Sequence, residues 1–277
     1  MGRVRHDAGP SPRRGEGWSG QRPWLYWRRR VCPLSDLTTS TGSRTGSVVT
    51  PAGSARLSAS VMCADFAALP SQLQALERGG IRCAHLDFGD GRFVRNLPLG
   101  VQIFAQLPPR VAWRRESHLM LSEPLELLHL FAPHSDLIFF HIEASSSASA
   151  CIQAIRDAGA RPGIALNPAT PPESIIDVLP VVDEILVMAV EPGFAGSPFV
   201  PEVVEKVGQI RALADAVNPE ITIELDGAIG PANIPSLVRA GADRFVGGTT
   251  GLFTGGDLEA SARSLIECIE QAVAEKR

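Results

Sequence analysis

Short apolar segments alternate with helix-patterned segments eight times between residue 56 and the C-terminus, and this alternation restricts the fold more than any other feature. The segments stay apolar throughout instead of alternating with polar residues, which is typical of parallel strands covered on both faces. Eight such units predict an α/β fold, a single (β/α)8 TIM barrel. An open, doubly wound sheet fits the same pattern, but no GxGxxG follows the first strand, which argues against dinucleotide binding.

Capping residues and the Gly and Pro residues between segments set the expected boundaries. The predicted strands are 57–62, 83–87, a strand that ends near His118, 136–142, 162–166, 184–190, 221–226 and 244–247. The predicted helices are 67–78, 99–107, 123–131, 148–158, 172–179, 201–217, 231–240 and 258–275.

Residues 1–54 differ from the rest of the chain. They are rich in Arg, Gly, Ser and Pro, and residues 1–50 contain nine Arg but only three acidic residues. We predict a disordered N-terminal extension, or translated upstream sequence, followed by the barrel domain at 55–277. An organelle transit peptide and an RNA-binding arm are the alternatives.

The overall composition excludes several functional classes. The net charge of −4 implies no polyanionic partner, and five Cys without a CxxC spacing indicate neither a disulfide framework nor a zinc knuckle. No apolar run reaches the roughly 18 residues that a membrane helix needs. We therefore expect a cytoplasmic protein with a small-molecule ligand and with neither a nucleic-acid nor a membrane partner.

Two His and two Asp residues mark the ends of three predicted strands. His85 and Asp87 are two residues apart, so they point to the same face of their strand, while His118 and Asp226 end the third and seventh strands. In such barrels the active site forms at the carboxyl ends of the strands. A mixed nitrogen and oxygen set suits one divalent metal ion, and two carboxylates suit proton transfer at two faces of a substrate carbon. A buried, hydrogen-bonded His–Asp pair is the alternative.

Glycine-rich segments follow the last three predicted strands. Segments 226–228 and 247–251 come after strands seven and eight, where barrels commonly bind phosphate through backbone N–H groups, in the second case ahead of a short helix. Segment 191–196 after strand six is predicted to be a mobile lid. Ordinary turns and a plain surface loop are the alternatives.

Several motifs together resemble one enzyme family. They are Ser60-Val61-Met62-Cys63-Ala64-Asp65-Phe66, the 85–94 segment, His118-Leu119-Met120, His141-Ile142-Glu143-Ala144, the 165–170 segment, Val187-Met188 and the 191–196 loop. From about residue 56 to residue 253, the chain is similar to the ribulose-phosphate 3-epimerase family. The resemblance implies a carbohydrate isomerase that inverts C3 of a ketose phosphate through a cis-enediolate. We also expect a homo-oligomer.

The resemblance also assigns roles to individual residues. It implies one divalent ion (zinc, iron, manganese or magnesium) held by His85, Asp87, His118 and Asp226, with Asp87 and Asp226 as the acid/base pair. The implied substrate-binding residues are Ser60, His118, Met120, Met188, Gly193, Phe194, Ala195, Gly196, Asp226, Gly227, Ala228, Gly248 and Thr249. A catalytically weak sugar-phosphate-binding barrel and another phosphate-binding barrel enzyme, such as a decarboxylase or synthase, are the alternatives.

Some details look more like the allulose-6-phosphate 3-epimerase branch than the ribulose-phosphate branch. They include Met62-Cys63, the 248–253 segment, and Ala228 in place of a second Gly. Gly89 stands where the family usually has Met, and we expect the lost side chain to leave room beside the metal. These details favour a six-carbon ketose phosphate over D-ribulose 5-phosphate and D-xylulose 5-phosphate.

Overall fold

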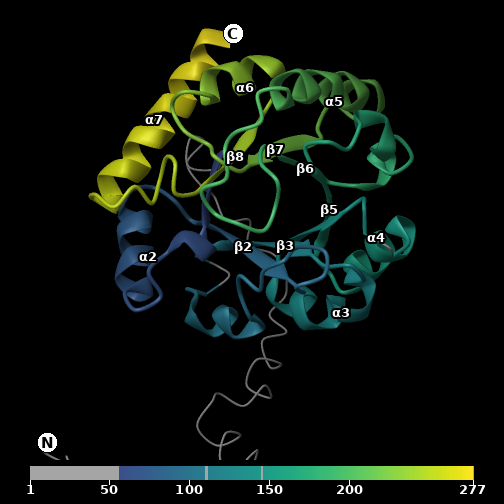
Figure 1. The fold of residues 1–277 in the computed structure, drawn as a ribbon, viewed down its shortest axis with the longest axis horizontal. Helices are drawn as coiled ribbons and strands as arrows, with labels where there is room; N and C mark the ends of the chain where they lie inside the picture. Colours follow the sequence, from purple (N-terminus) through teal and green to yellow (C-terminus); the bar gives the residue numbers. More distant parts are fainter. Residues whose placement is uncertain (1–55, 110–111, 145, 277) are drawn as a thin grey trace, which may run out of the picture. The chain divides into compact units, whose positions relative to one another are not determined.

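The structure is a computed structural model that describes residues 56–109, 112–144 and 146–276, so the predictions for residues 1–54 lie outside the described residues. Eight parallel strands form one closed barrel in the order of the sequence, with helices on its outside (Figure 1). The predicted TIM barrel is therefore confirmed. The strands are β1 (Leu57–Ser60), β2 (Cys83–Gly89), β3 (Arg114–Met120), β4 (Leu137–His141), β5 (Arg161–Leu166), β6 (Glu184–Met188), β7 (Thr222–Asp226) and β8 (Arg244–Gly247).

The described part of the chain contains six α-helices, and two predicted helices are wrong. The α-helices are α2 (Leu69–Arg78), α3 (Pro124–Phe131), α4 (Ala148–Asp157), α5 (Val203–Val217), α6 (Ile234–Ala240) and α7 (Leu258–Lys276). The predicted helix 99–107 is a 3₁₀ helix at Val101–Gln106, and 172–179 is replaced by short 3₁₀ turns at Pro172–Ile175 and Leu179–Val181. Prolines flank both segments and limit their length at the C-terminal end, because a residue before proline is disfavoured in the helical conformation.

Side chains alternate between two apolar layers along each strand. On β4, Ile138 and Phe140 face the helices and join the large outer core. Leu137 and Phe139 point into the barrel and belong to a smaller inner cluster. This alternation explains why the strands are buried on both faces and why their sequences read as continuous apolar runs.

The strand register brings polar side chains together at one end of the barrel. Asp87 of β2 lies opposite His118 of β3, and Met188 of β6 lies opposite Asp226 of β7. All strands run in the same direction, so these positions meet at the carboxyl end, where we expected the site. Within the described part of the chain, no helix is long and apolar enough to cross a bilayer.

Candidate active site

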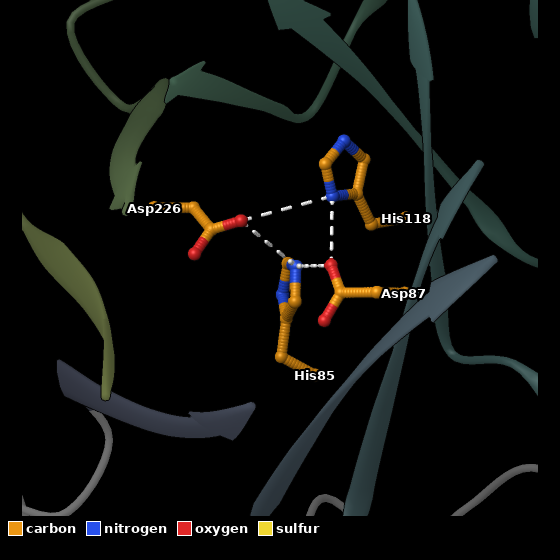
Figure 2. Close-up of side chains that lie close together, drawn as sticks. All are labelled: His85, Asp87, His118 and Asp226. Atoms are coloured by element: carbon orange, nitrogen blue, oxygen red, sulfur yellow. Dashed lines mark hydrogen bonds and ion pairs between the residues drawn. The ribbon is translucent and has the colours of Figure 1, made fainter. Parts of the chain in front are cut away.

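Four side chains from β2, β3 and β7 converge inside the carboxyl end of the barrel, as Figure 2 shows. Nδ1 of His118 lies 3.1 Å from Oδ1 of Asp87, and Nε2 of His85 lies 3.4 Å from the same oxygen. Oδ2 of Asp226 is 3.8 Å from both nitrogen atoms. The structure thus brings together the four residues predicted as metal ligands.

These side chains fit a divalent ion. Zinc-to-ligand bonds of about 2.0–2.2 Å place the ligand atoms of a tetrahedral site about 3.3–3.6 Å apart, and the observed separations of 3.1–3.8 Å bracket that range. Both ring nitrogens of His85 are buried and have no hydrogen-bond partner among the described residues. A buried polar atom without a partner is costly, so Nε2 of His85 is suited to coordination.

The electrostatics of these side chains also favour a cation. Burial raises the pKa of Asp226 to about 7, although His85 opposes this shift. Burial alone would lower the pKa of His85, but Asp87, Glu116 and Asp226 hold it well above its usual range. Burial lowers the pKa of His118 to about 4, which keeps its ring neutral near pH 7. A neutral imidazole beside a concentration of negative charge is a suitable metal ligand.

A pocket opens directly beside Asp87 and Asp226. Twelve of the residues predicted to bind substrate line it, and they are Ser60, Met120, Met188, Gly193, Phe194, Ala195, Gly196, Asp226, Gly227, Ala228, Gly248 and Thr249. His118 is fully buried and reaches the site only through Nδ1. The pocket is lined as well by Cys63, which was not among the predicted site residues. Its position three residues after Ser60, in the same motif, was the signal available in the sequence.

Ser60 contacts the Asp87 carboxylate directly. Its hydroxyl donates to Oδ2 of Asp87 at 3.1 Å, while Oδ1 of the same carboxylate faces His85 and His118. Both oxygens of Asp87 are therefore oriented by side chains of neighbouring strands. Burial alone would raise the pKa of Asp87, but His85 and His118 hold it below its usual range.

The loop after β7 adopts an unusual backbone conformation. Gly227 and Ala228 both have positive φ, and Ala228 is the only non-glycine residue with positive φ in the described part of the chain. A Cβ at Gly227 would lie 2.5 Å from Cγ2 of Val190, so this position requires glycine. Asn233 holds the turn by donating to the Ala228 carbonyl and accepting from the Gly230 N–H group.

The short helix expected after β8 is absent, because residues 248–252 form turns. The N–H groups of Leu252 and Phe253 both donate to the Gly248 carbonyl. Any anion at this loop would therefore meet turn N–H groups instead of a helix N-terminus. The next helix is α7, which begins at Leu258.

The loop after β6 reaches across the pocket toward the loop after β2. Nδ2 of Asn96 donates to the Gly193 carbonyl at 2.6 Å, and a Cβ at Gly193 would lie 2.8 Å from Cβ of Val94. Phe194 at the tip is 56% exposed. The lid role of this loop stays a prediction.

The expected space at Gly89 does not exist. A Cβ there would lie 2.7 Å from the Asn96 carbonyl oxygen, 2.9 Å from Cγ2 of Val94 and 3.0 Å from Cδ of Pro98. The loop after β2 therefore fills the volume of the missing side chain. The argument that Gly89 enlarges the site for a six-carbon substrate is wrong.

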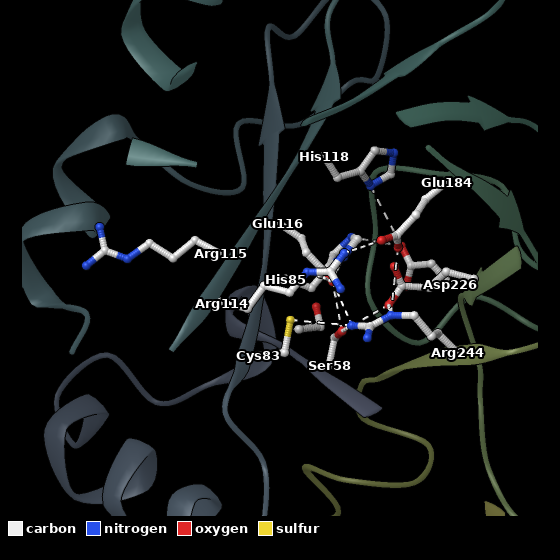
Figure 3. Close-up of polar contacts among 12 residues, drawn as sticks. Ser58, Cys83, His85, Arg114, Arg115, Glu116, His118, Glu184, Asp226 and Arg244 are labelled. Atoms are coloured by element: carbon white, nitrogen blue, oxygen red, sulfur yellow. Dashed lines mark hydrogen bonds and ion pairs between the residues drawn. The ribbon is translucent and has the colours of Figure 1, made fainter. Parts of the chain in front are cut away.

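A second charged cluster, which the sequence did not reveal, lies inside the barrel, closer to the amino ends of the strands than the site (Figure 3). Nη2 of Arg244 lies 2.7 Å from Glu116, and Nε of Arg114 lies 3.1 Å from the same carboxylate. Arg114 and Arg244 also pair with Glu184, and Arg244 lies 3.7 Å from Glu224. His85, Glu116 and Glu224 are close enough to hold a metal, but two guanidinium groups already supply the positive charge. We interpret this cluster as a structural ion-pair layer.

Comparisons with known proteins identify close relatives. The sequence profile of the Ribulose-phosphate 3 epimerase family matches residues 56–253. Ribulose-phosphate 3-epimerase 2 of Cupriavidus necator is 37% identical over 222 residues, which cover 78% of this chain and 92% of that protein. The ribulose-phosphate 3-epimerase of Aquifex aeolicus is 34% identical over 218 residues, covering 78% and 98% respectively.

Solved structures that resemble this barrel have more distant sequences. Orotidine 5'-phosphate decarboxylase from Pyrococcus horikoshii matches with a TM-score of 0.57 at 14% identity, covering 77% of this chain and 99% of that chain. The 3-hexulose-6-phosphate synthase from Salmonella typhimurium matches with a TM-score of 0.53 at 15% identity, covering 80% and 100%. At these identities the likeness concerns the fold alone.

Proposed function

Because the chain belongs to the ribulose-phosphate 3-epimerase family, it is a ketose-phosphate 3-epimerase, and we propose that Asp87 and Asp226 invert C3 at a divalent metal ion, each transferring a proton at one face. One observation carries the proposal. The two carboxylates come from β2 and β7, border the same pocket and converge with two imidazoles.

The two carboxylates divide the work between the faces of C3. One Asp takes the C3 proton and leaves a cis-enediolate, and the other Asp delivers a proton to the opposite face, so the configuration inverts. Ser60 orients Asp87 through its hydrogen bond to Oδ2. When held by His85, Asp87, His118 and Asp226, a divalent ion would supply positive charge beside the C2 oxygen.

The rest of the pocket suits a phosphorylated chain. The turns at Gly227, Gly248 and Thr249 border the pocket and can offer backbone N–H groups to a phosphate. Met120 and Met188 supply apolar surface beside the reacting carbons. Phe194 lies in the loop that would cover the bound sugar.

Two substrates are supported by different observations. The relatives' names favour D-ribulose 5-phosphate and D-xylulose 5-phosphate. The motif details, including Ala228, favour D-allulose 6-phosphate and D-fructose 6-phosphate. With the argument from Gly89 removed, we propose D-ribulose 5-phosphate as the first substrate and D-allulose 6-phosphate as the second candidate.

A coupled assay on both ketose phosphates, with metal content measured by elemental analysis, tests the function. We expect turnover of at least one substrate by protein that contains about one divalent ion per chain. Stoichiometric sugar-phosphate binding without turnover would favour a non-catalytic binder. Turnover unchanged after complete metal removal would refute the metal role. A kcat/KM ratio of more than ~10-fold, about 1.4 kcal/mol in transition-state stabilisation, decides which substrate is preferred.

Hydrogen exchange in deuterated water tests the two-base mechanism. Asp226→Asn should exchange the C3 hydrogen of one epimer without interconversion, because Asp87 can still serve one face. Asp87→Asn should exchange the hydrogen of the other epimer. Metal occupancy must be measured in parallel, since both residues are proposed ligands. A variant that keeps its metal and still epimerises near the parent rate would contradict the assignment.

A further inference from the structure

A chain of hydrogen bonds leads from the buried His118 ring, on the side away from the metal, toward the surface. Its Nε2 lies 2.8 Å from Nε2 of His141, and Nδ1 of His141 lies 3.1 Å from Oε2 of Glu143. The His118 and His141 rings are 0% and 1% exposed. We propose that His141 and Glu143 are positioning residues that fix Nδ1 of His118 as the metal-binding nitrogen, an inference that rests on the proposed function.

The relevant state is the one in which Nδ1 of His118 gives its lone pair to an ion. One N–H group on each ring then satisfies the chain, because an uncharged imidazole has one N–H group and one lone pair. An ionised Glu143 can only accept, so Nδ1 of His141 donates to it and Nε2 of His141 keeps a lone pair. Nε2 of His118 must then donate across the 2.8 Å contact. The remaining lone pair of His118 is on Nδ1, the atom that faces Asp87 and Asp226.

The opposite arrangement needs one more proton. If Nδ1 of His118 kept its proton and donated to Asp87, Nε2 of His118 would hold a lone pair, and the 2.8 Å contact would require a second proton on His141. With Nδ1 of His118 bound to an ion, both remaining contacts receive one N–H group each. The arrangement with one N–H group in each contact is therefore the one that leaves Nδ1 of His118 available to an ion.

Glu143 is itself held as an acceptor. Its Oε1 accepts from the Asn167 N–H group at 2.8 Å and from the Thr170 hydroxyl. Nζ of Lys206, a largely buried residue of α5, donates to the Asn167 carbonyl at 2.6 Å. Burial alone would raise the pKa of Glu143, but hydrogen bonds from His141, Thr170 and Asn167 lower it to about 2. The carboxylate is thus ionised and fixed by the loop after β5, which Lys206 of α5 contacts in turn.

The variant Glu143→Gln should reverse the chain without changing the size of the side chain. Its amide oxygen must stay with the Asn167 and Thr170 donors, so its NH₂ group would face Nδ1 of His141. That nitrogen would then have to accept, Nε2 of His141 would donate, and the proton of His118 would move to Nδ1. Metal binding would have to displace that proton and break the chain.

The test is a Zn²⁺ titration in competition with a chelator, using the full-length protein. We expect Glu143→Gln to bind Zn²⁺ about 10- to 100-fold more weakly than the parent, the range seen when partners of metal-binding His residues are removed. Thr170→Val is the matched control, because it also touches Glu143 but leaves the carboxylate in place, and its affinity should change by less than about threefold. His141→Leu is the second variant, should Glu143→Gln fail to fold, and it should also weaken binding at least tenfold.

Nitrogen NMR of the Zn²⁺-loaded parent distinguishes a positioning role of His141 from a merely structural one, because it reports which ring nitrogen carries the proton. His141 should be the Nδ1–H tautomer, with a lone pair on Nε2. An Nε2–H tautomer of His141, or equal Zn²⁺ affinity in the parent and Glu143→Gln, would overturn this inference while the epimerase assignment stands. If the parent itself binds no divalent ion and still epimerises, both this inference and the proposed metal role are refuted.

Discussion

Replacing Arg244 with Met should strongly destabilise the barrel, because it removes the guanidinium group at the centre of the buried ion-pair layer. Nη2 of Arg244 lies 2.7 Å from Glu116 and donates to Ser58 at 3.0 Å, and Nε lies 3.7 Å from Glu224 and 3.8 Å from Glu184. The Arg244 side chain is only 10% exposed. Met fills a similar volume but leaves the buried Glu116 carboxylate with Arg114 as its remaining arginine partner, while Glu184 keeps Arg114 and Arg161.

The magnitude follows from the cost of leaving buried charges unpaired. Removing one partner of a buried ion pair costs about 3–5 kcal/mol, a large part of the roughly 5–15 kcal/mol that stabilises a typical domain. With a urea m-value of about 1–3 kcal/mol per molar, the unfolding midpoint should fall by at least about 1 M. Urea titrations followed by far-ultraviolet circular dichroism measure this change.

A matched control separates burial from the loss of an arginine. Arg263 pairs with Glu259 on the surface of α7, and its side chain is 58% exposed. Arg263→Met should therefore cost less than about 1 kcal/mol. A loss below about 1 kcal/mol for Arg244→Met would refute the reasoning. In a double-mutant cycle with Glu116→Gln, the two losses should be smaller together than their sum, because the second change removes one of the unpaired charges.

Three further outcomes are expected. Chelation should abolish epimerisation and lower the melting temperature, since an ion at 100 times its Kd stabilises the fold by about 2.7 kcal/mol. His118→Ala should have the same two effects as chelation. An unchanged melting temperature after complete metal removal would contradict the site. Gly163→Ala should cost about 1–3 kcal/mol of unfolding free energy, because its Cβ would lie 2.4 Å from the Phe139 ring. Gly256→Ala is the control, since no atom lies within 4 Å of the added Cβ. Equal denaturant midpoints for the two variants would contradict the packing argument. Burial alone would raise the pKa of Glu143, but hydrogen bonds lower it to about 2 in the folded protein, so its carboxylate should stabilise the fold above its ordinary pKa and lose that contribution as pH falls toward 2. The unfolding free energy of Glu143→Gln should therefore depend less on pH than that of the parent below about pH 4.5. Parallel curves of unfolding free energy against pH would contradict this.

Local patterns were sufficient for most of the fold. Eight apolar segments separated by Gly, Pro and capping residues predicted every strand, because buried parallel strands need apolar residues on both faces. The helices were less predictable in the short segments between prolines, at 99–107 and 172–179. There the apolar pattern continues, but the backbone forms short 3₁₀ helices.

The candidate site was predictable where one strand carries two of its residues. His85 and Asp87 share a face by the two-residue period of a strand, and the barrel architecture implied that His118 and Asp226 would end their strands nearby. The space expected at Gly89 was wrong, because the atoms that fill it belong to residues 94–98 of a loop whose course no local pattern describes.

The sequence by itself determined the strand order, the shared face of His85 and Asp87 and the residue types available for metal and proton chemistry, since these depend on short patterns along the chain. Only the tertiary structure decided which inward side chains meet. Ser58, Glu116 and Arg244 come from β1, β3 and β8 and contact one another across 58 to 186 positions of sequence. Closure of the barrel makes β1 and β8 neighbours, so these charges become partners through a contact that no local sequence pattern encodes.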